Sequence, residues 1–160
     1  MVLLDRDILE LKESVIAHSR WLHSCPEIGF EVYKTRDYIL EQLEEFGFDE
    51  IKILAETGIK AVMRGKVGAR TLAFRADMDA LAIEEKTELE FASKRKGFMH
   101  ACGHDGHMAI LLGLAQLLSQ DKDNIDDNIV LIFQPDEERE GGALPMIEEG
   151  LLEDPKVDAI

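Results

Sequence analysis

The sequence predicts a single α/β domain in which helices cover a mixed β-sheet. Segments with apolar residues at helical spacing alternate with short β-rich segments along the chain. A continuous apolar run at 128–134, NIVLIFQ, is typical of a central strand that is covered on both faces. The chain has 160 residues, 46% of them hydrophobic, without internal repeats or linkers. One domain with a substantial core is therefore expected.

Two amphipathic helices are expected first. One covers residues 5–23 and ends before Pro26, and the other stops at Gly47. The apolar residues that set the helical spacing are Ile8, Leu11, Val15 and Leu22 in the first helix, and Val32, Ile39, Leu40, Leu43 and Phe46 in the second. Both segments carry polar residues between these positions, which predicts that each helix buries one face.

Strands and further helices should follow. Three short β-rich segments separated by glycine-containing turns predict strands at 50–56, 60–66 and 70–76. After these strands we expect a buried helix at 108–120, the central strand at 128–134, a helix at 142–152 with Pro145 in its first turn, and a last strand at 156–160. The predicted order alternates helices and strands in the second half, which favours the α/β class.

Charge and the N-terminal sequence exclude several classes of partner. The formal net charge is -15, from 33 acidic and 18 basic residues, so the surface repels nucleic acid and anionic membranes. The N-terminus lacks a cationic segment followed by a long apolar run, and no stretch is long enough for a membrane span. A cytoplasmic location is therefore expected. Cys25 and Cys102 could form a disulfide, but in a reducing compartment a cysteine among histidines is more often a ligand or nucleophile.

Three polar clusters fall where strands end and helices begin. RADMDA (75–80) leaves the third predicted strand, HACGHDGH (100–107) precedes the buried helix, and QPDEERE (134–140) leaves the central strand. The carboxyl ends of strands in open α/β sheets face the ligand crevice. We therefore expect the three clusters to meet at one site.

The residue types indicate a metal site. Cys102 and His104 can turn toward one divalent ion, since Gly103 between them permits a tight backbone, and zinc suits this mixture of thiolate and imidazole. Of the adjacent Glu137 and Glu138, one could bind the ion while the other acts as general base on a water, and spacing does not decide which.

Other carboxylates could support this site. Asp77 and Asp79 could orient a ligand histidine through its other ring nitrogen. Asp105 could cap the following helix or take part in catalysis. The acidic run DEERE at 136–140 would by itself indicate a solvated turn, and only its place after a buried strand favours a functional role.

Alternative schemes have less support. His18 and His23, far from the cluster in sequence, are expected to be surface or capping residues. A thiol protease would pair Cys102 with a histidine from a distant segment rather than one a few residues away. Neither of the two glycine-rich nucleotide-binding motifs is present, so nucleotide binding is not predicted.

Long motifs match a known family. Residues 20–35 (RWLHSCPEIGFEVYKT), 75–113 (RADMDALAIEEKTELEFASKRKGFMHACGHDGHMAILLG) and 133–150 (FQPDEEREGGALPMIEEG) closely resemble metal-dependent amidohydrolases of the aminoacylase and carboxypeptidase superfamily. The similar branch contains hippurate hydrolase, N-acetyldiaminopimelate deacetylase and indole-acetyl-amino-acid hydrolases. The resemblance implies a zinc-exopeptidase-like catalytic domain with a dinuclear zinc or manganese site that cleaves small N-acyl amino acids or peptide-like amides. It also implies that Cys102, His104 and Glu138 are ligands and that Glu137 is the general base.

The resemblance further implies that the domain is incomplete. Relatives continue beyond 158–160 into a strand with another ligand histidine, a lid and dimerisation domain, and a returning segment with the last histidine. Residues 1–160 are therefore expected to be the N-terminal part of the catalytic domain, without the lid. We expect one metal ion or none, poor or no turnover, and an exposed sheet edge that allows homo-oligomers to form.

Two hypotheses follow for the chain. It is either a metalloamidohydrolase, complete in the cell or supplemented by a second chain, or a truncated or degenerate module that keeps the fold and at most one metal but no catalysis. Assays with a panel of N-acyl amino acids and added metal would distinguish them.

Overall fold

The computed structural model describes residues 8–160. In this range the elements in chain order are α2 (Lys12–Ser24), α3 (Tyr33–Glu45), β1 (Glu50–Leu54), β2 (Gly58–Met63), β3 (Thr71–Asp77), α4 (His104–Gln120), the short 3-10 helix η1 (Lys122–Asn124), β4 (Asn128–Gln134) and α5 (Ala143–Glu148). The strands form one mixed sheet in the order β1-β2-β4-β3. The predicted α/β class is therefore confirmed.

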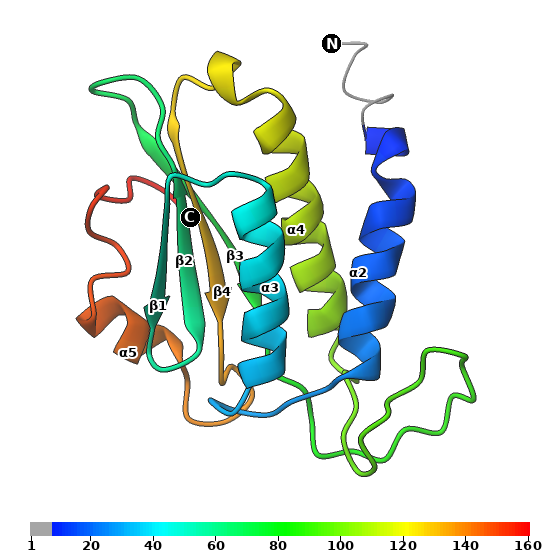
Figure 1. Cartoon of the computed structure of the whole chain (residues 1–160). Helices are drawn as coiled ribbons and strands as arrows, with labels where there is room; N and C mark the ends of the chain where they lie inside the picture. The colour runs from blue at the N-terminus through cyan, green and yellow to red at the C-terminus, as the bar shows by residue number, and fades with distance from the viewer. Residues whose placement is uncertain (1–7) are drawn as a thin grey trace.

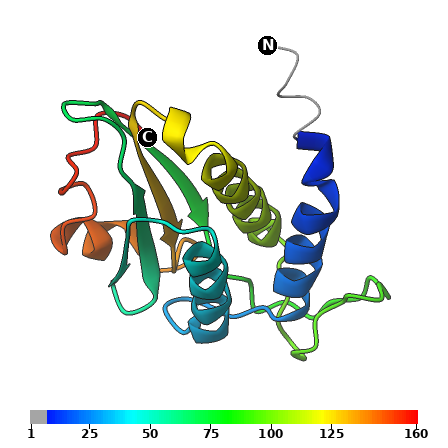
Figure 2. The same cartoon turned by 45° about the horizontal axis from the view of Figure 1, so that its top comes forward.

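Helices cover both faces of the sheet. Helices α2, α3 and α4 lie on one face and α5 lies on the other, as Figures 1 and 2 show from two directions. The larger core lies under the three helices, and the buried side chains that the sheet contributes to it include Ile59, Ala61, Met63, Leu131 and Phe133. A smaller core under α5 contains Val62, Val130, Ile132 and Met146. Strand β4 is thus buried on both faces, as its continuous apolar sequence predicts.

The topology brings the end of β3, the start of α4 and the end of β4 to one edge of the sheet. Strands β3 and β4 are parallel, and their last residues Asp77 and Gln134 pair with each other. Parallel neighbours need a crossover connection, which here contains α4. The segment that leaves β3 must therefore form its loops at this edge before α4 begins.

Some boundaries differ from those predicted. Helix α4 begins at His104, four residues before the predicted start. The prediction was late because the first turn is polar and shows no apolar periodicity. Helix α5 ends at Glu148, and Gly150 follows at a φ of +90°, a backbone conformation that commonly ends helices. The strand expected at 156–160 is only an isolated bridge between Leu72 and Ala159. Residues 5–7 of the first predicted helix lie outside the described residues.

None of the helices in the described part of the chain is long and apolar enough to cross a membrane.

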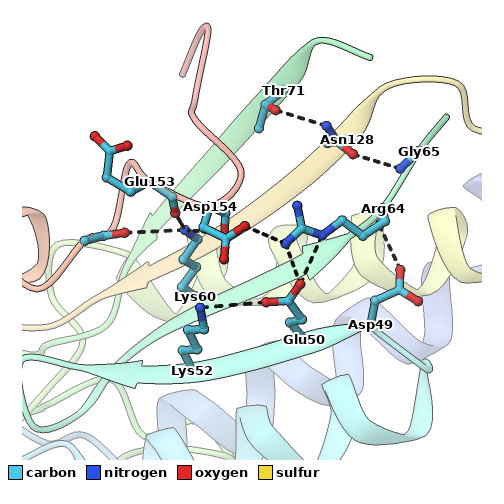
Figure 3. Close-up of polar contacts among 11 residues, drawn as sticks. Asp49, Glu50, Lys52, Lys60, Arg64, Gly65, Thr71, Asn128, Glu153 and Asp154 are labelled. Atoms are coloured by element: carbon cyan, nitrogen blue, oxygen red, sulfur yellow. Dashed lines mark hydrogen bonds and ion pairs between the residues drawn. The ribbon is translucent and has the colours of Figure 1, made fainter. Parts of the chain in front are cut away.

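A buried lysine holds the segment after α5 against the sheet. Lys60 on β2 is 1% exposed, and burial lowers its pKa. Its ammonium group donates to the backbone carbonyls of Asp154 (3.3 Å) and Gly150 (3.5 Å). It also donates to the carbonyl of Glu153, which lies beside it in Figure 3. Beside it, the Arg64 guanidinium bridges the carboxylates of Glu50 and Asp154. These cations anchor the C-terminal segment to β1 and β2.

Lys60→Met should lower the free energy of unfolding by about 1–3 kcal/mol, because it removes the donor from buried carbonyl groups while keeping most of the side-chain volume. Lys52 is a matched control, since it lies directly opposite Lys60 on β1 but is solvent-exposed beside Glu50. Lys52→Met should change stability by less than about 0.5 kcal/mol. Urea unfolding of both variants checks this, and equal losses would contradict a special role for Lys60.

Candidate metal centre

The polar clusters predicted at strand ends meet at the edge formed by β3 and β4. Asp77 is the last residue of β3 and Asp79 follows it, while Glu137 and Glu138 follow β4. The crossover connection brings Cys102 and His104 to the same edge, and Gly103 between them adopts a φ of +89° at the start of α4. This left-handed conformation is one that glycine adopts without strain, which is the role predicted for Gly103.

A thiol, an imidazole and a carboxylate lie within bonding reach of a common centre. One ligand atom from each of Cys102, His104 and Glu138 lies within 4.8 Å of the other two. Glu138 Oε1 is buried, 3.7 Å from His104 Nε2, and has no hydrogen-bond partner among residues 8–160. Leaving a buried carboxylate oxygen without a partner is costly. A divalent cation would satisfy it, and this donor set fits zinc in particular.

The geometry of His104 leaves one ring nitrogen for a ligand. His104 Nδ1–H donates to the backbone carbonyl of Asp79 at 2.8 Å. In the neutral ring, Nε2 therefore carries the lone pair, and it faces Asp77 Oδ2 at 3.6 Å and Glu137 Oε2 at 3.9 Å, in addition to Glu138. Burial would lower the pKa of His104, but its contacts with Asp79 and Asp77 outweigh burial and raise it.

Asp79 organises both sides of the centre. Its side chain is fully buried, and its two carboxylate oxygens accept the backbone N–H groups of Glu137 (3.0 Å) and Glu138 (3.1 Å). Burial would raise the pKa of Asp79, yet hydrogen bonds from His104 and from these backbone groups lower it overall. The sequence suggested that an aspartate carboxylate would orient a ligand histidine. His104 Nδ1 lies 2.8 Å from the Asp79 carbonyl and 3.5 Å from its carboxylate, and the same carboxylate also holds the glutamate pair.

Asp77 belongs to a second group of residues with metal-binding side chains. Asp77, His104 and His107 also place ligand atoms within 4.8 Å of one another. Asp77 Oδ1 lies 2.6 Å from His107 Nδ1, and Oδ2 accepts from Arg75 at 3.0 Å. His107 was within the predicted cluster but had no assigned role. Since one imidazole nitrogen binds one ion and His104 has only Nε2 free, the two groups are alternatives for a single ion.

The Glu138 carboxylate also affects the cysteine. A hydrogen bond between the Cys102 thiol and Glu138, together with the negative charge of this carboxylate, raises the pKa of the thiol. Cys102 is exposed and is not in a disulfide, and neither is Cys25. A bound divalent cation would reverse this effect, because a coordinated thiol loses its proton.

The expectation that His18 and His23 lie on the surface is wrong. Both are buried, at 6% and 8% exposure. His18 Nδ1 contacts the Tyr38 hydroxyl at 2.8 Å. His23 Nδ1 contacts Asp105 Oδ2 at 2.8 Å, and Asp105 provides no side-chain cap to α4 in the described structure. Helical position alone could not reveal these contacts, because their partners lie 20 and 82 residues away in the sequence.

His100 is buried beside the centre without a partner for either ring nitrogen among the described residues. Burial lowers its pKa to about 4. Between that value and about 6.5, the usual histidine pKa, the unfolded chain binds more protons than the folded chain. The free energy of unfolding should therefore fall as the pH drops through this window.

His100→Leu should remove this dependence. In metal-free protein, the free energy of unfolding should fall between about pH 6.5 and 5 for the native chain. The fall should exceed that of the variant by up to about 1.4 kcal/mol per pH unit. Urea unfolding at several pH values checks this. Parallel pH profiles for the native chain and the variant would contradict the burial of a neutral imidazole.

Comparisons with known proteins agree with the fold and the motifs. Residues 73–160 match the model of peptidase family M20/M25/M40. The chain is 46% identical over 152 residues to thermostable carboxypeptidase 1 of Saccharolobus solfataricus, covering 93% of this chain and 39% of that protein. It is 44% identical over 151 residues to an N-acyl-L-amino acid amidohydrolase of Geobacillus stearothermophilus, covering 94% and 41%. The chain thus spans about two fifths of the length of these curated relatives.

Solved structures give the same result. A dinuclear metal-binding peptidase of the M20 family from Bacillus subtilis superposes with a TM-score of 0.82 at 42% identity, covering 88% of this chain and 39% of that one. An aminobenzoyl-glutamate utilization protein from Klebsiella pneumoniae superposes with a TM-score of 0.75 at 26% identity, covering 94% and 43%. The family match covers more than half of the sequence and includes every residue of the candidate metal centre. The chain therefore belongs to peptidase family M20/M25/M40.

Proposed function

We propose that this chain carries the metal-binding and proton-transfer residues of an amidohydrolase that acts on N-acyl amino acids or related small peptide-like amides. The observation that carries the proposal is the meeting of a thiol, an imidazole and a carboxylate, one oxygen of which is buried without a hydrogen-bond partner among the described residues, next to a second, more exposed glutamate. The names of the relatives, an N-acyl-L-amino acid amidohydrolase and carboxypeptidases among them, support the substrate class.

In this proposal Cys102, His104 and Glu138 hold one divalent ion, zinc or manganese. The burial of the two glutamates supports the division between them. The Glu138 side chain is 20% exposed and has the partnerless oxygen, whereas the Glu137 side chain is 42% exposed and can reach solvent. Glu138 is therefore assigned as ligand and Glu137 as general base. Asp79 positions both through their backbone N–H groups.

The reaction is hydrolysis of an amide. A bound divalent cation supplies Lewis acidity, which polarises the amide carbonyl and makes a nearby water more acidic. Glu137 takes a proton from the attacking water as the new C–O bond forms. It then returns the proton to the amine nitrogen as the C–N bond breaks, so the products are a carboxylic acid and an amine, which ionise to a carboxylate and an ammonium group at neutral pH. Asp79 keeps Glu137 in place, and the Nδ1 hydrogen bond of His104 keeps its Nε2 directed at the centre.

We further propose that residues 1–160 form part of a catalytic domain and that this chain alone has poor or no turnover. The two candidate ligand groups share His104 Nε2, so the described residues support one ion rather than two. The B. subtilis neighbour is a dinuclear metal-binding peptidase, and a second ion here would need ligands beyond those that the described residues offer.

Metal analysis and activity assays test the proposal together. The purified chain should bind one zinc or manganese ion, and Cys102→Ala should bind far less. A firm stoichiometry of two would contradict the single-ion site, and no binding would contradict the metal centre. A panel of N-acyl amino acids should be hydrolysed weakly if at all by the 160-residue chain, and strongly by a chain of the relatives' length. A long chain that binds metal but hydrolyses none of them would be a non-catalytic module.

A further inference from the structure

Residues 81–99 form a long excursion immediately before the predicted metal ligands. In the described structure this segment contains neither a helix nor an extended strand, and the antiparallel bridge between Leu81 and Met99 closes its base. It projects past the C-terminal end of α2 in Figure 1. Irregular segments of this length are uncommon in compact domains unless they have a function. Because Cys102 follows three residues after Met99, the position of this segment affects the position of the thiol.

His23 joins this segment to the first turn of α4. It lies in the last turn of α2, and its Nδ1 contacts Asp105 Oδ2 at 2.8 Å while its Nε2 contacts Glu85 Oε1 at 3.1 Å. Each nitrogen faces a carboxylate, which can only accept a hydrogen bond when ionised. When both carboxylates are ionised, both nitrogens donate, and the ring is then an imidazolium held between two carboxylates. Phe91 packs edge-on against the same ring, with 5.5 Å between ring centroids.

Glu85 is also the residue around which the excursion folds. Its other oxygen, Oε2, accepts the backbone N–H of Ser93 at 2.6 Å, and Oε1 also accepts the Thr87 hydroxyl. The backbone N–H of Lys94 donates to the carbonyl of Ser24, the residue after His23, at 2.9 Å. The excursion is thus attached to the end of α2 at both Glu85 and Lys94.

We propose that His23 is a positioning residue that fastens residues 81–99 to the first turn of α4, and thereby sets the positions of Cys102 and His104. The effect on metal binding rests on the proposed metal centre. The attachment of residues 81–99 by His23 does not depend on it. Asp105 is the neighbour of His104, and Glu85 belongs to the segment that leads to Cys102. One side chain therefore links both metal-ligand positions to α2.

A packing role alone does not account for these contacts. His18 lies on the same helix, is buried to the same degree and contacts a neutral hydroxyl on Tyr38. His23 instead pairs with two carboxylates from different segments. Burial would lower the pKa of His23, but hydrogen bonds with Glu85 and Asp105 outweigh it and raise the pKa, whereas burial lowers the pKa of His18.

The test compares His23→Gln with the matched control His18→Gln. Two quantities are measured on the 160-residue chain: the affinity for Co²⁺, followed by thiolate-to-cobalt absorption, and the rate of trypsin cleavage in metal-free protein. The excursion offers trypsin four sites, at Lys86, Lys94, Arg95 and Lys96. His23→Gln should weaken Co²⁺ binding about 10-fold or more, as loss of groups that support metal ligands commonly does, and should speed cleavage in the excursion.

His18→Gln should lower stability but leave both quantities at the native value. Native Co²⁺ affinity in His23→Gln, or unchanged cleavage of its excursion, would overturn the inference. If the native chain bound no Co²⁺, the proposed function would fail, while the cleavage rates would still test the fastening.

Glu85→Gln approaches the same contact from the other side, and it keeps the inference testable if His23→Gln does not fold. It should reproduce the loss of Co²⁺ affinity and the faster cleavage. The combined effect of the double variant should be clearly smaller than the sum of the two single effects, because both changes break the shared contact between His23 and Glu85. Fully additive effects would mean that His23 and Glu85 act separately, and would overturn the proposal.

Discussion

Glu138→Gln should weaken zinc binding on the order of 100-fold or more, whereas Glu137→Gln should leave the zinc affinity within a few-fold of the native value. Glu138 provides the buried oxygen that lacks a hydrogen-bond partner beside His104 Nε2. Glutamine replaces this carboxylate with a neutral amide, which is a weaker metal ligand. Glu137 is more exposed and is assigned to proton transfer. Competition with a chromogenic chelator measures both affinities. In a chain with full activity, Glu137→Gln should lower kcat by about 10²–10⁴-fold.

Glu140→Gln serves as the control for this pair. It lies in the same turn, contacts Asp136 only through its backbone N–H, and should change neither the affinity nor kcat. If Glu137→Gln lost the metal while Glu138→Gln kept it, the two roles would have to be exchanged. If neither substitution altered zinc affinity, the glutamate pair would not take part in metal binding.

Asp79→Ala should destabilise the metal-free chain by about 2–4 kcal/mol and also weaken zinc binding about 10–100-fold. The variant loses two buried hydrogen bonds to an ionised group and leaves the N–H groups of Glu137 and Glu138 without their acceptor. The loss of affinity follows because residues that orient ligands usually have effects of this size. Urea unfolding and chelator competition measure the two effects.

Asp126→Ala is the control for this substitution, since Asp126 is an exposed carboxylate paired with Lys66. This substitution should lower the free energy of unfolding by less than about 0.5 kcal/mol and leave the zinc affinity unchanged. A native zinc affinity in Asp79→Ala would show that the glutamate turn keeps its shape without the aspartate, and would contradict the positioning role of Asp79.

Much of the fold could be predicted because its elements have clear local patterns. The run at 128–134 is apolar throughout, and β4 has these same bounds. The start of α4 could not be predicted, because its first turn, residues 104–107, is polar and does not follow the amphipathic pattern of a helix. The strand predicted at 156–160 was wrong as an extended strand, since of these five residues only Ala159 forms a bridge to β3.

The centre could be predicted in outline but not in detail. Residue chemistry and the strand ends grouped Cys102, His104 and the glutamate pair, and the structure brings these side chains together. Spacing could not separate the two glutamates, because the difference between them is one of burial. It also could not find the contacts of His23, whose partners lie 62 and 82 residues away.

The dependence of the centre on Asp79 limits how the motif could be used elsewhere. Asp79 holds His104 through its carbonyl and the glutamate turn through its carboxylate, so three loops share one buried anchor. Transplanting HACGHDGH into a foreign scaffold would carry the thiol and the imidazole. It would not reproduce their position relative to the Glu138 carboxylate. Engineering a transferable binding module from this protein would require grafting the paired ends of β3 and β4 as a unit.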